Sequence, residues 1–184
     1  MLPVITSILY ATDLSETAEH ALHFAAAIAA RQGAELTVLH VLPDELEMYS
    51  EEAGFDIAAV FGEEAARMID RGDVENAKKA IGTRIRQTIS GCLHPETLDR
   101  VFGGKKIIVT AGDPAAEILK EASSEKYQLL VLGTHGLSGW TSMMVGSVAG
   151  QVAKHGRIPT MVVPLPGKIR ADSAGEAEPA EAKA

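Results

Sequence analysis

Residues 127–136 read Tyr-Gln-Leu-Leu-Val-Leu-Gly-Thr-His-Gly, an apolar run that stops at the first of two glycines. The apolar part has the length and composition of a buried strand, and glycines let the chain turn sharply at its end. The chain continues through a loop to Gly146 and Ser147, after which the residues up to His155 have helical composition. A strand, a glycine loop and a helix start, in this order, can direct free backbone N–H groups at phosphate oxygens.

Strand and helix patterns also alternate at the beginning of the chain. An apolar run at residues 7–11 is followed by Ser15, a preferred N-cap residue, and then by apolar residues at helical spacing as far as Gly33. Residues 35–42 are mostly Leu and Val, as expected of a strand that is buried on both faces of a parallel sheet. These residues therefore predict one βαβ unit.

The last part of the domain repeats the alternation. Residues 106–110 form an apolar run, Asp113 and Pro114 mark a helix start, and the following residues keep helical spacing up to Ser123. A final apolar run at residues 160–163 lies between two prolines. The five predicted strands, separated by helices, indicate an α/β fold: a five-stranded parallel sheet with helices on both faces, of the Rossmann-like kind.

Residues 44–104 interrupt this regular alternation. The clearest helix in this long connection starts near Asp73 and places Ile81 and Ile89 on one face. We interpret the whole segment as an enlarged helical crossover between two strands. Its first part, residues 48–71, has three alternative interpretations: a lid over a site, an arm toward a partner subunit, or simply more crossover.

Composition and charge limit the domain organisation and the partners. We expect one domain over residues 1–166 and a disordered tail over residues 167–184, which has almost no large apolar side chain. The formal net charge of −8 argues against a nucleic-acid surface, because such surfaces need clustered Lys and Arg. Cys92 is the only cysteine, which excludes an intrachain disulfide. Since no apolar run approaches the roughly 18 residues of a membrane span and no signal-peptide pattern is present, we expect a cytoplasmic protein without a membrane partner.

Three segments from distant parts of the sequence are expected to meet at one end of this sheet. Residues 11–13 follow the first strand, residues 41–42 end the second, and the glycine loop at residues 133–147 follows the fourth. In parallel sheets of this kind, ligands bind beyond the carboxyl ends of the strands, at the point where the winding reverses. The sequence therefore predicts a ligand crevice formed by these three segments.

The same segments resemble the universal stress protein (UspA-like) family, and the resemblance covers most of residues 4–164. Residues 8–15, 34–41 and 112–114 are similar to the family's opening strand with its aspartate, its second strand and its third turn. The glycine loop resembles the pattern of the family's ATP-binding subgroup: Gly, two residues, Gly, nine residues, Gly, and Ser or Thr. The resemblance implies the adenine-nucleotide alpha-hydrolase-like variant of the fold and bound ATP, or else ADP or AMP.

The resemblance also implies which residues line the nucleotide site. Ala11, Thr12 and Asp13 would line the adenine and ribose side with Val41 packed on the base, Gly133, His135 and Gly136 would follow the ribose and first phosphate, and Gly146, Ser147 and Val148 would bind the phosphate chain. Many relatives carry Lys or Arg in the middle of this loop, whereas residues 137–145 contain neither. Without that charge a triphosphate gains less attraction, so binding can depend on Mg²⁺ or Mn²⁺, for which Asp13 is the candidate ligand.

Simpler interpretations of the same residues stay open. Gly133 and Gly136 can serve only to turn a loop, and Gly146 only to permit close helix packing. Asp13 can act as a turn or cap residue alone. His40 lies inside an apolar strand, and we interpret it as a core histidine rather than a metal ligand or base.

Three functional hypotheses follow. The favoured one is an ATP-binding stress-response or regulatory protein that acts through dimerisation and partner binding, with slow or no hydrolysis. The family resemblance and the strand at Thr160–Val163 indicate a homodimer joined along that strand's edge. The alternative is a nucleotidyl- or phosphoryl-transfer enzyme with Asp13 as base or metal ligand, but the loops contain no Walker lysine and no cationic finger, and we assign no catalytic residue. The third hypothesis is a dimeric scaffold that binds no nucleotide.

Overall fold

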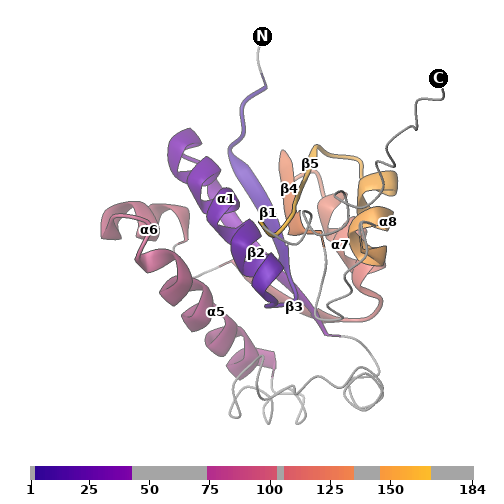
Figure 1. Ribbon diagram of the computed structural model, residues 1–184, viewed down its shortest axis with the longest axis horizontal. Helices are drawn as coiled ribbons and strands as arrows, with labels where there is room; N and C mark the ends of the chain where they lie inside the picture. Colours follow the sequence, from indigo (N-terminus) through magenta and orange to yellow (C-terminus); the bar gives the residue numbers. More distant parts are fainter. Residues whose placement is uncertain (1–2, 43–73, 103–105, 135–145, 167–184) are drawn as a thin grey trace, which may run out of the picture.

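A computed structural model describes residues 3–42, 74–102, 106–134 and 146–166. Within these ranges the chain forms one five-stranded parallel sheet flanked by helices (Figure 1). The strands are β1 (Ser7–Thr12), β2 (Glu35–Leu42), β3 (Ile107–Ala111), β4 (Leu129–Gly133) and β5 (Thr160–Val163). The helices are α1 (Glu16–Gln32), α5 (Val74–Ser90), α6 (Pro95–Val101), α7 (Pro114–Ala122) and α8 (Ser147–His155). The predicted α/β fold is confirmed.

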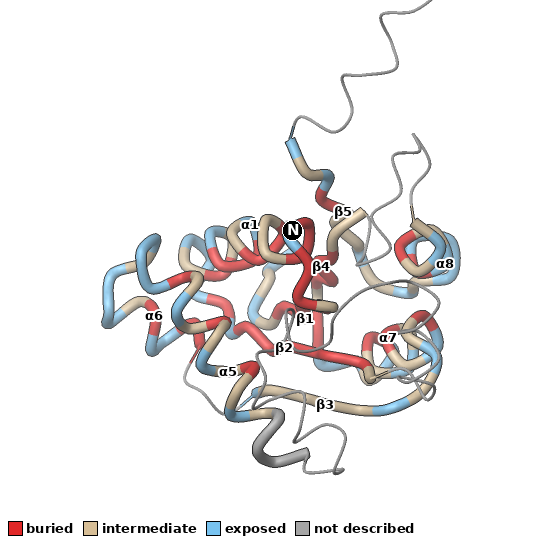
Figure 2. Tube along the Cα trace, turned by 60° about the horizontal axis from the view of Figure 1, so that its bottom comes forward, coloured by how far each residue is buried: buried red, intermediate tan, exposed pale blue. Residues whose placement is uncertain are grey.

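The strand order is β3-β2-β1-β4-β5, and all neighbouring pairs are parallel. From β1 the chain moves outward through β2 to β3, then returns to the other side of β1 to form β4 and β5. The winding direction therefore reverses between β1 and β4. The three inner strands are almost fully buried, whereas β3 and β5 at the two edges are mostly half-buried (Figure 2).

Helices cover both faces of the sheet (Figure 1). Each face has its own apolar core. On one face, α1, α5 and α6 share a core with strand residues such as Ile8, Leu36 and Val131. On the other face, α7 and α8 share a core with Leu39 and Leu130. The inner strands are apolar at successive positions because both of their sides face a layer of helices.

Two helices begin where their N-cap residues predicted. The Ser15 Oγ atom accepts a hydrogen bond from the Ala18 N–H at 3.2 Å, which caps α1. The Asp113 Oδ1 atom accepts one from the Ala116 N–H at 2.8 Å, which caps α7. At its other end α1 stops at Gly33, whose φ of 69° is in the left-handed region. These boundaries depend on contacts within a few residues, which is why the sequence predicts them well.

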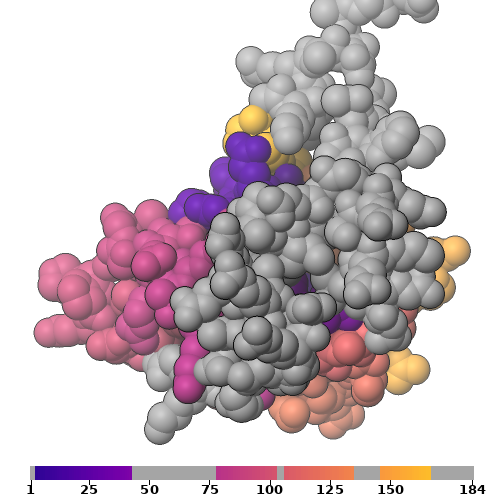
Figure 3. Space-filling view, turned by 90° about the horizontal axis from the view of Figure 1, so that it is seen from below, coloured from indigo at the N-terminus to yellow at the C-terminus, as the bar shows by residue number. Residues whose placement is uncertain are grey.

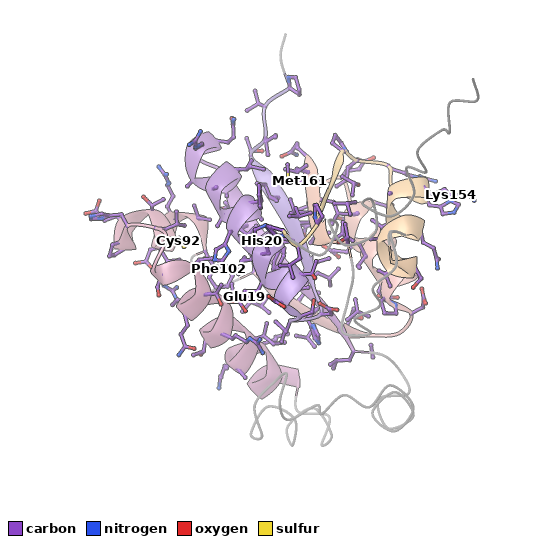
Figure 4. All side chains as sticks on the ribbon, in the orientation of Figure 1. Glu19, His20, Cys92, Phe102, Lys154 and Met161 are labelled. Carbon is purple, nitrogen blue, oxygen red and sulfur yellow. The ribbon has the colours of Figure 1, made fainter. Side chains whose placement is uncertain are left out.

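Helices α5 and α6 occupy the part of the predicted crossover that the structure describes. Helix α5 begins at Val74, next to its predicted start, and its side chains Ile81 and Ile89 are buried in the core that it shares with α1. After α6 the chain passes through Phe102, which is buried in the same core (Figure 4). The crossover therefore forms part of the layer that covers one face of the sheet.

Several predictions concern the regions around this core. Those for residues 48–71 and for the tail at residues 167–184 lie outside the described residues.

In the described part of the chain, no helix is both long and apolar enough to cross a membrane. Cys92 is exposed in the turn between α5 and α6 (Figure 4).

Candidate functional site

Five of the described residues of the predicted site lie at or directly after the carboxyl ends of the inner strands. Figure 3 views the molecule from this end, with α5 (magenta) on one side and α7 (orange-pink) on the other. Ala11 and Thr12 end β1 and are followed by Asp13, Val41 is the next-to-last residue of β2, and Gly133 ends β4. The registers of the parallel pairs bring these strand ends to one level. The structure thus brings together the ends of three strands that are far apart in the sequence.

The start of α8 lies beside the end of β4. The Gly146 N–H donates a hydrogen bond to the Thr134 carbonyl oxygen at 2.8 Å, and the Thr134 N–H donates one to the Val163 carbonyl oxygen at 3.0 Å. Ser147 and Val148 then begin the helix. These two backbone hydrogen bonds tie the beginning of α8 to the ends of β4 and β5.

The first turn of α8 differs from the first turns of α1 and α7. Its N-cap is Gly146, so no side chain of the cap residue bonds to the N–H groups of that turn. In α1 and α7 the side chains of Ser15 and Asp113 fill this role. Uncapped N–H groups at a helix start attract anions, because they carry the positive end of the helix dipole.

The side chains of Thr12 and Asp13 hold the turn after β1. Thr12 Oγ1 accepts a hydrogen bond from the Leu14 N–H at 3.0 Å, and Asp13 Oδ1 accepts one from the Ser15 N–H at 3.1 Å. Leu14 has a φ of 63°, in the left-handed region that residues other than glycine rarely adopt. Asp13 therefore acts as a turn residue, as its simpler interpretation predicts, and its contact with a ligand stays a prediction.

Two side chains from other parts of the sequence bond to the carbonyl oxygens of the same turn. His40 Nδ1 donates to the Thr12 carbonyl oxygen at 2.7 Å, and Arg84 Nη2 donates to the Leu14 carbonyl oxygen at 3.2 Å. His40 is buried, as predicted of a core histidine, and burial lowers its pKa. Since a carbonyl oxygen only accepts, the neutral ring carries its proton on Nδ1. Sequence reasoning missed both contacts, because nothing near residue 12 in the chain points to residues 40 or 84.

Two predicted ligands, His135 and Gly136, lie outside the described residues. Among the residues that are described, no group of three or more His, Cys, Asp or Glu side chains could hold a metal ion. The Mg²⁺ or Mn²⁺ ion expected near Asp13 therefore stays a prediction.

The family model of the universal stress protein family matches residues 5–164. The chain belongs to this family. It is 33% identical over 156 residues to the universal stress protein MJ0577 of Methanocaldococcus jannaschii, which covers 85% of this chain and 93% of the relative. It is 30% identical over 160 residues to the universal stress protein YxiE of Bacillus subtilis, which covers 87% of this chain and 99% of the relative.

Solved structures of universal stress proteins share the fold. The structure of MJ0577 superposes with a TM-score of 0.62 at 27% identity. The superposed part covers 90% of this chain and 99% of the MJ0577 chain. The structure of UspA from Lactobacillus plantarum superposes with a TM-score of 0.59 at 24% identity. The superposed part covers 86% of this chain and 97% of the UspA chain. The second likeness supports the fold alone.

In this universal stress protein, the first glycine of the loop has a packing role. Gly133 has no room for a side chain, because Thr17 and Ala18 in the first turn of α1 lie against it. Gly146 differs, since its φ of −54° and ψ of 155° are open to any residue. Backbone strain therefore does not account for the glycine at position 146.

Proposed function

We propose that this universal stress protein binds an adenine nucleotide, ATP or else ADP or AMP, at the carboxyl ends of its inner strands. The observation that carries the proposal is the hydrogen bond of 2.8 Å from the Gly146 N–H to the Thr134 carbonyl oxygen. It holds the start of α8, whose cap residue Gly146 has no side chain, beside the end of β4, where the winding of the sheet reverses. Sheets of this type bind their ligands at that point.

The phosphate chain would bind at the start of α8. Backbone N–H groups of the first helical turn can donate to phosphate oxygens, and the helix dipole favours negative charge there. Ser147 is exposed at this position and adds a hydroxyl group. Gly146, Ser147 and Val148 would thus contact the phosphates, with Gly133, His135 and Gly136 on the side of the ribose and the first phosphate.

The adenine ring would lie between the ends of β1 and β2. Ala11 and Val41 are buried on neighbouring strands and belong to the same apolar cluster, on the face covered by α7 and α8. An aromatic base gains from apolar contact of this kind. Thr12 and Asp13, in the adjacent turn, would contact the ribose side.

The sequence of the glycine loop favours binding without fast hydrolysis. Residues 137–145 contain no Lys or Arg, and the whole chain has a formal net charge of −8. Phosphoryl transfer requires cationic groups or metal ions on the transferred phosphate, so we expect at most slow turnover, with Mg²⁺ or Mn²⁺ supporting affinity. The protein would act in the stress response as a regulatory module, through dimerisation and partner binding, in a domain that spans residues 1–166.

Nucleotide content and thermal stability test this proposal together. Protein purified without added nucleotide is denatured, and the released small molecules are identified by mass spectrometry, which separates ATP, ADP and AMP. The melting temperature of nucleotide-free protein is then measured with increasing ATP, with and without Mg²⁺. A ligand at 100 times its dissociation constant stabilises the folded state by about 2.7 kcal/mol, which gives a clear shift. Protein that releases no nucleotide and shows no shift with ATP, ADP or AMP contradicts the proposal and favours the scaffold hypothesis.

A further inference from the structure

The turn at residues 12–15 holds Leu14 in a conformation that a leucine does not favour. Leu14 is buried and has a φ of 63°, although a branched side chain disfavours the left-handed region. Hydrogen bonds from Leu14 and Ser15 to the side chains of Thr12 and Asp13 close the turn from inside. Such a conformation persists only where the surrounding structure also holds it.

Arg84 bonds to this turn from outside. Its Nη2 atom donates to the Leu14 carbonyl oxygen at 3.2 Å, between residues that are 70 positions apart in the sequence. The bond fixes the carbonyl group of the residue with positive φ, so it acts on the orientation of the peptide unit between Leu14 and Ser15. His40 holds the other end of the same turn, through the Thr12 carbonyl oxygen at 2.7 Å.

Helix α5, which carries Arg84, has a fixed position on the sheet. Ile81 and Ile85, on either side of Arg84, are both 2% exposed in the core under α1. Gly82 lies so close to β3 that a Cβ atom there would be 2.5 Å from Ile107 Cδ1. Arg86 Nη2 also donates to the Phe102 carbonyl oxygen at 3.1 Å. The packing of α5 therefore fixes the position from which the guanidinium group of Arg84 reaches the turn.

We propose that Arg84 is a positioning residue of the nucleotide site. By holding the Leu14 carbonyl group, it keeps Thr12 and Asp13 in the geometry that receives the adenine and ribose, so the position of the crossover helix α5 sets the affinity of the site. The effect on affinity rests on the proposed function, whereas the effect on the turn does not.

Arg100 provides a matched control. Its Nη2 atom donates to the Ala30 carbonyl oxygen, also at 3.2 Å and also across 70 residues, but at the opposite end of α1. Arg84→Gln and Arg100→Gln therefore each remove one arginine-to-carbonyl hydrogen bond, and only the first removes it from the turn. Arg84→Lys keeps a cationic donor and should recover part of any loss; it also serves where Arg84→Gln does not fold.

Two measurements test the inference. We expect Arg84→Gln to weaken ATP binding about tenfold by calorimetry, the result if the turn keeps its competent geometry in about a tenth of the molecules, with Arg100→Gln close to wild type. We also expect the Leu14 and Ser15 amides to exchange hydrogen faster in Arg84→Gln, as measured by NMR without nucleotide, and not in Arg100→Gln. Unchanged exchange at these two amides overturns the inference, and so does unchanged affinity in a protein that binds ATP. If wild-type protein binds no nucleotide, the proposed function fails instead, and the exchange rates alone decide whether Arg84 holds the turn.

Discussion

Gly133 at the end of β4 lies directly against Thr17 in the first turn of α1, and a Cβ atom on Gly133 would be 2.9 Å from Thr17 Cγ2. The same atom would be 3.1 Å from the Thr17 carbonyl carbon and 3.2 Å from the Ala18 nitrogen. Helix backbone atoms cannot move aside as the tip of a long side chain can. The close packing of α1 on β4 therefore requires glycine at this position, with or without a nucleotide.

Gly133→Ala should destabilise the protein in the absence of nucleotide. Overpacking at a tight contact costs about 1–3 kcal/mol, and urea unfolding of nucleotide-free protein measures the loss. Thr17→Ser in the same chain should recover part of it, because it removes the Cγ2 atom but not the backbone contacts. Gly91→Ala is the control, since a Cβ atom there meets nothing within 4 Å. If Gly133→Ala keeps the stability of the wild type but no longer binds nucleotide, Gly133 is needed for contact with the phosphate rather than for packing.

Gly146→Val should abolish the stabilisation by ATP while leaving the fold intact. The backbone at Gly146, with φ −54° and ψ 155°, accommodates valine, but the side chain would occupy the expected path of the phosphates. The measurement is the melting temperature with and without ATP. Gly91→Val, in the turn between α5 and α6, should keep the full ATP-dependent rise. An equal rise in Gly146→Val would remove the start of α8 from the site.

Val162→Pro should convert the proposed dimer to a folded monomer. The carbonyl oxygens of Pro159 and Val163 accept hydrogen bonds from the β4 side, so by strand alternation the Val162 N–H points to the open edge of the described sheet. Proline has no N–H group and so removes this donor. An edge strand such as β5 tolerates proline, because its outer N–H groups bond to no neighbouring strand in the described sheet.

Light scattering after size-exclusion chromatography measures the mass of this variant. Val162→Ala is the control, because it shortens the side chain but keeps the N–H group and should remain dimeric. A monomeric wild-type protein would refute pairing along β5 outright.

Stability should fall in mild acid because of His40. Burial lowers the pKa of this residue below its ordinary value of 6.5, so the unfolded chain takes up the proton at a higher pH than the folded protein does. The contribution of His40 is therefore complete above about pH 6.5 and decreases as the pH falls below it, by at most about 1.4 kcal/mol per pH unit.

His40→Asn isolates this effect. Asparagine can still donate to the Thr12 carbonyl oxygen, but it does not titrate. Urea unfolding curves at several values between pH 7 and pH 5 give the unfolding free energy of both proteins. We expect the wild type to lose stability relative to the variant as the pH falls. Parallel profiles for the two proteins would show that His40 does not cause the loss of stability.

The sequence alone determined the parts of this protein that depend on nearby residues or on simple periodicity. The apolar runs predicted all five strands, because a strand between two layers of helices is apolar on both sides. Ser15 and Asp113 predicted the starts of α1 and α7, because an N-cap bonds to an N–H only three residues away. The resemblance of residues 8–15, 34–41, 112–114 and the glycine loop indicated the family, which the match over residues 5–164 confirms.

Only the tertiary structure decided which residues hold the site in place. The contacts of Arg84 with Leu14 and of His40 with Thr12 join positions 70 and 28 residues apart, and no local pattern marks such pairs. The packing role of Gly133 also depends on α1, which comes more than a hundred residues earlier in the chain. Spacing along a sequence shows that a glycine is present, whereas the reason for it is a neighbour that only the folded chain brings close.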